Sequence, residues 1–184
     1  MRLTIKSRTN ARKCEAKQAR RRGEIPAVIY APGKANELIT INAAEFAAVL
    51  RNTVQGKLAT TVFAIDGRKA IVKEIQYDPT SYRVIHIDFQ EVTVDRPVQV
   101  KVPIYCIGGA ESVGVKAGGF LRQVLRYVEV ECPSDAILEE IQVNVKDLGI
   151  RQKKRLSDLP IPKNVRPLAK MDEVVVVIAK KQQA

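Results

Sequence analysis

The sequence predicts a mainly β fold with a few helices, divided between two domains. Short apolar segments recur along the chain, and several alternate between apolar and polar side chains, as half-buried strands do. Glycine, proline and Asp-Gly turn signals separate these segments, and the character of the sequence changes near residue 92. A length of 184 residues suffices for one large domain or two ordinary ones, and a hydrophobic content of 46% allows real cores.

The first 42 residues predict a strand, a basic helix and a hairpin. Residues 2–6, RLTIK, alternate weakly and form the first expected strand. A polar loop then leads into a short basic helix, EAKQARRRG, which ends at Gly23 where a C-terminal cap belongs. After Pro26 the strands AVIYA and ELITIN flank the turn APGK, and this arrangement is typical of a hairpin.

An amphipathic helix and a second hairpin are expected next. Asn42 opens the segment NAAEFAAVLR, with Glu45 three residues later as in a capping box and Phe46 on its apolar face. The dipeptide Asp66-Gly67 joins TTVFAI to RKAIVKEIQ and suits the positive φ angles of a two-residue hairpin turn.

The segment VIHIDFQEV predicts a half-buried antiparallel strand. Ile87 and Phe89 fall on one face of this strand, whereas His86, Asp88 and Gln90 fall on the other. We place a domain boundary at its end, so that the expected domains are residues 1–91 and 92–184. The second domain is expected to be mostly β, with strands at 97–105, 127–132, 141–145 and 173–179.

Positive charge is concentrated at the N-terminus. Residues 1–23 contain nine Lys or Arg and one Glu, so this segment holds +8 of the net charge of +11. A focused positive field attracts a polyanion. Nucleic acid is favoured over a membrane surface because the segment RKCEAKQARRR lacks the large apolar side chains of a membrane-binding helix.

Several other classes of protein are disfavoured. The longest apolar run, VVVVIA, is far shorter than the roughly 20 residues of a membrane span, and the N-terminus lacks the apolar region of a secretory signal, so the cytoplasm is the expected compartment. Cys14, Cys106 and Cys132 are widely spaced, and the chain contains a single histidine. This composition argues against a metal site or a disulfide framework. No motif couples a nucleophile to a base, so we expect neither an enzyme nor a cofactor.

The residues that could bind RNA have two interpretations at this stage. Lys17 to Arg22 carry four positive charges and no negative one, which indicates a phosphate-binding surface rather than a mixed solvated helix face. Tyr30 offers a ring or a hydroxyl close by. Spacing alone leaves His86 and Asp88 open, either as RNA contacts or as an exposed polar pair. The run RQKKR at 151–155 is either a second RNA contact or a solvated loop.

The segments ARRRGEIPAVIYAPGK, IQYDP and HIDF, in this order, resemble one bacterial family. It is the family of large-subunit ribosomal protein number twenty-five in its long form, known as the general stress protein CTC family. The resemblance covers the whole chain, because RPVQVKVPI, GGFLRQVLRYVEVECPSDAI and VNVKDL are similar to the second domain of that family.

The resemblance implies a small N-terminal β-barrel domain that binds 5S ribosomal RNA at an irregular helix, and a C-terminal β-rich domain. The partners it implies are 5S ribosomal RNA and other components of the large ribosomal subunit, with no membrane and with an unknown partner for the second domain. A stress-related RNA-binding or protein-binding module acting off the ribosome is the alternative. The RNA-binding residues that the resemblance implies are Arg8, Lys13, Lys17, Arg20, Arg21, Tyr30, Lys73, Gln76, His86 and Asp88. Arg21 is included because it lies in the basic run of Lys17 to Arg22.

Overall fold

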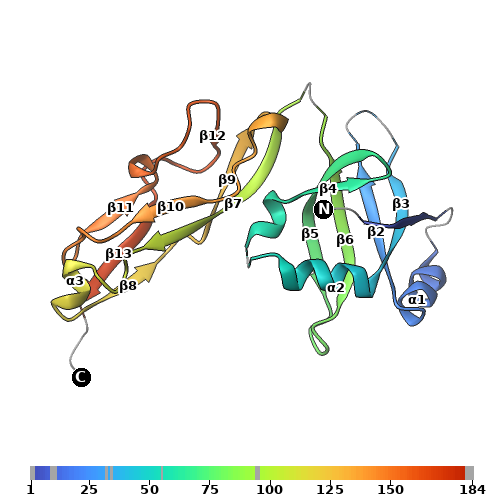
Figure 1. The fold of residues 1–184 in the computed structure, drawn as a ribbon, viewed down its shortest axis with the longest axis horizontal. Coiled ribbons are helices and arrows are strands. Elements are labelled where there is room, and N and C mark those ends of the chain that lie inside the picture. The colour runs from blue at the N-terminus through green and yellow to red at the C-terminus, as the bar shows by residue number, and fades with distance from the viewer. Residues whose placement is uncertain are drawn as a thin grey trace. The chain divides into compact units, whose positions relative to one another are not determined.

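The computed structural model of the chain is mainly β, as the sequence predicts (Figure 1). It describes residues 3–8, 12–31, 33, 35–54, 56–93 and 96–180. The chain separates into two compact units, Met1–Arg96 and Pro97–Ala184, so the division falls after Arg96, whereas we placed the boundary after residue 91. Each unit has its own buried residues and is described separately below.

The first unit is built on a curled six-stranded sheet with the strand order β1-β3-β2-β6-β5-β4. The backbone N–H of Leu3, just before β1, donates to the carbonyl oxygen of Ala64 in β4 at 3.3 Å. This bond joins the two ends of the sheet and gives the unit the form of a small barrel. The strands are β1 (Ile5–Ser7), β2 (Glu24–Tyr30), β3 (Glu37–Asn42), β4 (Val62–Ile65), β5 (Arg68–Tyr77) and β6 (Val84–Glu91).

Both predicted hairpins form, and β6 has a second partner that the sequence did not reveal. Strands β2 and β3 pair antiparallel, as do β4 and β5, whose turn has φ angles of 46° at Asp66 and 78° at Gly67. Strand β6 is antiparallel to β5, as expected, but it also pairs in parallel with β2 through Ala27 and Ile87. The parallel pairing places the polar side chains of β6 beside those of β2.

Two helices pack on the barrel, α1 (Lys13–Arg21) and α2 (Ala43–Asn52), and a short 3₁₀ helix η1 spans Lys57–Thr60. Asn42 caps α2 as predicted, because its Oδ1 accepts from the backbone N–H of Ala44 at 2.8 Å. Glu45 does not complete a capping box, however. Its carboxylate accepts from the backbone N–H of Thr4 at 3.4 Å and so connects α2 to the segment before β1.

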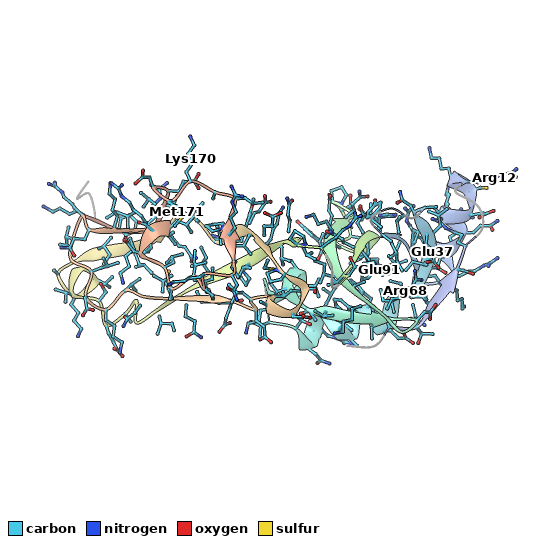
Figure 2. The ribbon with its side chains drawn as sticks, turned by 90° about the horizontal axis from the view of Figure 1, so that it is seen from above. Arg12, Glu37, Arg68, Glu91, Lys170 and Met171 are labelled. Carbon is cyan, nitrogen blue, oxygen red and sulfur yellow. The ribbon has the colours of Figure 1, made fainter. Side chains whose placement is uncertain are left out.

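The barrel core is filled by aromatic and branched side chains. Phe63 and Phe89 meet edge to face with ring centroids 6.0 Å apart, and Phe46 from α2 is fully buried beside them. At the rim, Arg68 at the start of β5 donates to Glu37 at 2.7 Å and lies 3.6 Å from the buried carboxylate of Glu91 (Figure 2). These contacts hold the ends of three strands together.

The second unit consists of two sheets, with strand orders β10-β7-β9-β12 and β11-β13-β8. The sequence predicts β7, β9, β10 and β13 but misses the three other strands. The elements are β7 (Val98–Ile107), α3 (Val113–Lys116), β8 (Gly119–Gln123), β9 (Tyr127–Cys132), η2 (Ser134–Ala136), β10 (Ile141–Asn144), β11 (Lys153–Arg155), η3 (Leu156–Asp158), β12 (Arg166–Pro167) and β13 (Val174–Lys180).

The glycines around the start of β8 have a packing role. Gly118 has a φ of 86°, and a Cβ atom on Gly119 would lie 2.7 Å from the carbonyl oxygen of Gly114. A Cβ atom on Gly114 would lie 2.7 Å from the carbonyl carbon of Gly149. A side chain on Gly119 would therefore force the start of β8 away from α3, and one on Gly114 would force α3 away from the segment at Gly149.

Candidate nucleic-acid interface

The basic helix α1 presents its positive charges as one stripe. Ala19 is buried against the barrel and defines the inner side of the helix. With 3.6 residues per turn, Lys13, Lys17 and Arg20 lie within about 60° of one another around the helix, turned away from Ala19, and Arg21 lies beside them. All four are exposed. We call these four residues the basic stripe.

The basic stripe is attached to strand β6 by one of its own members. The Nε atom of Arg20 donates to the backbone carbonyl of Ile85 at 3.0 Å. Ile85 directly precedes His86, so the C-terminal end of the stripe lies at the start of the polar face of β6. This bond uses one of the five N–H donors of the guanidinium group. The helix and the strand therefore form one continuous polar surface.

Asp88 lies between two other polar side chains on that surface. The hydroxyl of Tyr30, from β2, donates to Oδ2 of Asp88 at 3.0 Å. The Nδ1 atom of His86 lies 2.7 Å from Oδ1 of Asp88, close enough for an ion pair although not aligned as a hydrogen bond. The parallel pairing of β2 with β6 makes this group possible, because it brings Tyr30 next to the outer face of β6.

The environment of Tyr30 keeps its hydroxyl protonated. Partial burial is the main cause that raises the pKa of Tyr30, and the hydrogen bond to Asp88 and the negative charges of Asp88 and Glu74 raise it further. The side chain is still 36% exposed. Tyr30 is therefore a neutral hydrogen-bonding group with an accessible ring at the edge of the polar face.

Strand β5 contributes Gln76 and Lys73 to the same side of the sheet. Gln76 is directly opposite His86 in the antiparallel pairing, and Glu74 is opposite Asp88. The register shifts between Val72 and Glu74, so Lys73 is the extra residue of a β-bulge and is exposed, as Glu74 is. The structure thus brings Lys73 and Gln76 together with the residues of β6.

Arg8 is the predicted site residue that lies apart from this group. It is half-buried after β1, and its Nε atom has no hydrogen-bond partner among the described residues. Together with Glu15, Gln18 and Arg22 it lines a recess of about 410 Å³. Those three residues are on the flank of α1 opposite the basic stripe, so Arg8 borders a different surface.

The sequence did not indicate two participants in the site. The carbonyl of Ile85 is a backbone group, and whether it can accept a hydrogen bond from Arg20 depends on how α1 packs on the barrel. Glu74 faces Asp88 only because of the bulge at Lys73. A β-bulge has no signature in the alternation of RKAIVKEIQY, so neither relation could be derived from spacing.

Other kinds of site are not found in the described residues. They contain no group of three or more His, Cys, Asp or Glu that could hold a metal ion, and none of their helices is long and apolar enough to cross a membrane. Cys132 is buried and Cys106 half-buried, and burial raises the pKa of both thiols, whereas Cys14 is exposed on α1. These two raised pKa values disfavour reactive thiolates at Cys106 and Cys132.

Comparison with known proteins is consistent with the division of the fold. The model of the Ribosomal L25p family matches residues 3–89, and that of the ribosomal protein TL5 C-terminal domain matches residues 97–182. Proteins named large ribosomal subunit protein bL25 from Chlamydia abortus, Chlamydia pneumoniae and Chlamydia caviae are 43%, 40% and 42% identical over 185 residues. Each alignment covers 98% of this chain and 100% of the relative.

These matches extend over both units, and the relatives align along their whole length. The chain therefore belongs to the ribosomal L25p family, in the form that carries a TL5-type C-terminal domain, and it is a ribosomal protein with a structural rather than a catalytic role.

Proposed function

We propose that this chain is a component of the large ribosomal subunit in the cytoplasm and that its first unit binds 5S ribosomal RNA. The names of the bL25 relatives support the assignment to the large subunit. The observation that carries RNA binding is the bond from Arg20 to the carbonyl of Ile85, because it joins the basic stripe to the polar face of β6. The specific partner, 5S RNA, comes from the family resemblance.

In this proposal the basic stripe contacts phosphates. Lys13, Lys17 and Arg20 repeat along one flank of α1, and Arg21 widens the stripe. A rigid helix holds these cations at fixed spacing, so they can follow a phosphate backbone and set the register of the barrel on the RNA. Their contribution to the binding affinity decreases as the salt concentration rises, because each neutralised phosphate releases counterions.

The polar face of β6 reads local structure in the RNA. An A-form helix displays 2′-hydroxyls and base edges in a shallow minor groove, and irregular pairs change the shape of that groove. His86, Gln76 and Tyr30 provide donors and acceptors on a sheet that cannot easily deform. Asp88 contacts the side chains of both His86 and Tyr30, so we assign it mainly to positioning these two residues.

The two remaining predicted residues, Lys73 and Arg8, are assigned different roles. Lys73 is held outward by its bulge and extends the surface on the β5 side. Arg8 borders the recess on the other flank of α1, so we expect its contact to fall on a phosphate outside the main surface.

The proposal is tested by capture of RNA from cell extract with the tagged full chain, together with sedimentation of the extract. We expect 5S RNA as the main captured species and the chain in the fraction of the large subunit. The variant with Ala at all four stripe positions is expected to lose this RNA. The control Lys163→Ala/Arg166→Ala, which removes exposed charges from the second unit, is expected to keep it. Capture of other RNAs without 5S, or absence from the large subunit, contradicts the proposal.

A further inference from the structure

The two sheets of the second unit differ sharply in charge. The strands of the sheet β11-β13-β8 contain five basic residues, Arg122, Lys153, Lys154, Arg155 and Lys180, and no acidic residue. The strands of the other sheet contain two basic residues, Lys101 and Arg166, and two acidic ones, Glu129 and Glu131. One sheet is therefore positive throughout, while the other is balanced.

Hydrogen bonds show which face of the positive sheet points outward. Gln123 in β8 donates to the carbonyl of Ile104 in β7 at 2.8 Å, and Lys154 in β11 donates to the carbonyl of Asn144 in β10 at 2.6 Å. Both side chains therefore face the other sheet. Because side chains alternate along a strand, Arg122 and Lys153 point away from it.

The outward cations lie in one row across the sheet. In the pairing register, Val177 of the central strand β13 is opposite Lys153 on one side and Arg122 on the other. With neighbouring strands about 4.8 Å apart, the two backbone positions are about 10 Å apart. Both side chains are exposed. Arg155 differs, because its guanidinium group is 2.6 Å from the carboxylate of Asp172.

An exposed aromatic ring extends the same face. Phe120 alternates with Arg122 along β8 and is 48% exposed. Its partner in the register is Ala179, whose small side chain covers little of the ring. We call Phe120, Arg122, Lys153 and Val177 the basic sheet face. It combines an accessible ring with two cations on a rigid sheet.

We propose that the basic sheet face binds RNA, with Arg122 and Lys153 on phosphates and an unpaired base stacked on Phe120. Sheet surfaces that carry aromatic and basic side chains bind unpaired nucleotides in this way, and stacking is tolerant of sequence. A protein partner is disfavoured because protein interfaces are depleted in lysine and in charge at their cores, whereas on this face two cations, one of them Lys153, flank Val177 and the strands contain no acidic residue. The site is in the second unit and is independent of the proposed 5S contact.

The test uses the full chain with Lys13, Lys17, Arg20 and Arg21 replaced by Ala, so that the first unit does not dominate binding. The probe is an oligouridylate of about 20 nucleotides, titrated over a range of salt concentrations. In this background Arg122→Ala/Lys153→Ala is expected to weaken binding and to reduce the slope of log affinity against log salt by about 1.4 in magnitude, since each lost phosphate contact contributes about 0.7. The matched control Lys163→Ala/Arg166→Ala removes the same charge elsewhere in the second unit and is expected to leave the slope nearly unchanged.

A second variant separates RNA binding from attraction to any polyanion. Phe120→Leu removes the ring but no charge, so we expect about a fivefold or greater loss of affinity for the oligouridylate, with the same slope and with unchanged binding to inorganic polyphosphate. Circular dichroism and thermal unfolding of each variant check that the second unit stays folded. Equal binding by the face variant and its control overturns the proposal. So does an unchanged affinity of Phe120→Leu, which identifies a general anion surface or a protein contact instead.

Discussion

At the scale of single residues, the feature that needs explanation is a carboxylate on a surface proposed to bind RNA. Asp88 would repel phosphates, yet it accepts a hydrogen bond from Tyr30 and lies 2.7 Å from Nδ1 of His86. Both neighbours are polar groups that can turn about their side-chain bonds when nothing holds them. A carboxylate between them restricts the orientations of both side chains. We infer that Asp88 weakens the attraction of this surface to phosphates but fixes the geometry of His86 and Tyr30.

This role predicts different effects for two substitutions. Asp88→Ala is expected to reduce the preference for 5S RNA over a regular RNA duplex by about tenfold, since it removes the Tyr30 hydrogen bond and the contact to His86 together, and a single hydrogen bond contributes about 0.5–1.5 kcal/mol. Tyr30→Phe removes one hydroxyl and keeps the ring, so a smaller loss is expected. Because the pKa of Tyr30 is raised, this smaller loss is expected to stay constant from neutral pH to about pH 9.

Competition binding with the two RNAs measures the preference directly. The salt dependence serves as the internal control, since neither change removes a cation and the slope is expected to stay as in the unchanged chain. If Asp88→Ala weakens binding to both RNAs equally, the group does not read local structure and acts only on general affinity.

At the scale of secondary-structure elements, α1 holds the basic stripe in place with few contacts. Its sequence has no large apolar side chain, and only Ala19 is buried. The helix is fixed instead by the Arg20 bond to β6 and by Gly23, whose φ of 78° turns the chain directly into β2. A short, polar helix can therefore keep a defined position, and its cations remain on the surface.

We expect Lys17→Ala/Arg20→Ala to weaken 5S RNA binding and to lower the magnitude of the salt slope by about 1.5 to 2, because two phosphate contacts are lost. The first unit is expected to stay folded, because the exposed Lys17 contributes within about 0.5 kcal/mol and the lost Arg20 bond to Ile85 costs about 0.5–1.5 kcal/mol of the free energy of unfolding. Salt titration and chemical denaturation measure these two quantities.

The matched control is Arg51→Ala/Lys69→Ala. It removes two exposed charges from the first unit at positions outside the basic stripe, with Arg51 in α2 and Lys69 near the start of β5. If the control and the stripe variant show the same slope, position on the helix is irrelevant and only net charge attracts the RNA.

The elements also show how far the sequence could predict the fold. Segments with strong local signals were predicted, such as the Asp66-Gly67 hairpin, the Asn42 cap and the alternation around Ile87. The strands that were missed, β8, β11 and β12, have only two to five residues, too few for a period to emerge. Their pairing depends on β9 and β13, which lie elsewhere in the sequence.

In the candidate site too, features that are local in the sequence could be predicted, whereas contacts between distant residues could not. The cluster of Lys and Arg in α1 is local and visible in the sequence. The contact of Tyr30 with Asp88 requires the parallel pairing of β2 with β6, between residues separated by 58 positions. For the run RQKKR, the structure shows that Lys154 and Arg155 bond to Asn144 and Asp172, so the run is neither a solvated loop nor uniformly available to RNA.

At the scale of the whole molecule, net charge does not decide which unit binds RNA. Residues 1–96 have a net charge of +7 and residues 97–184 a net charge of +4, a modest difference. What differs is the arrangement. The first unit has four cations on one short helix joined to a polar strand, whereas the second has two outward cations on one face of one sheet. Counterion release depends on how many cations reach phosphates of one RNA together.

We therefore expect the fragment 1–96 to keep most of the affinity of the full chain for 5S RNA and nearly its full salt dependence. With about five phosphates neutralised, log affinity is expected to fall against log salt with a slope of about −4 to −5. The fragment 97–184 is expected to bind the same RNA weakly and with a shallow slope. Salt titration of both fragments, after circular dichroism has shown that each is folded, provides the measurement. A slope near zero for the first fragment, or tighter binding by the second, would mean that the clustering of charge in α1 is not what attracts the RNA, and 5S recognition would then have to be sought in the second unit.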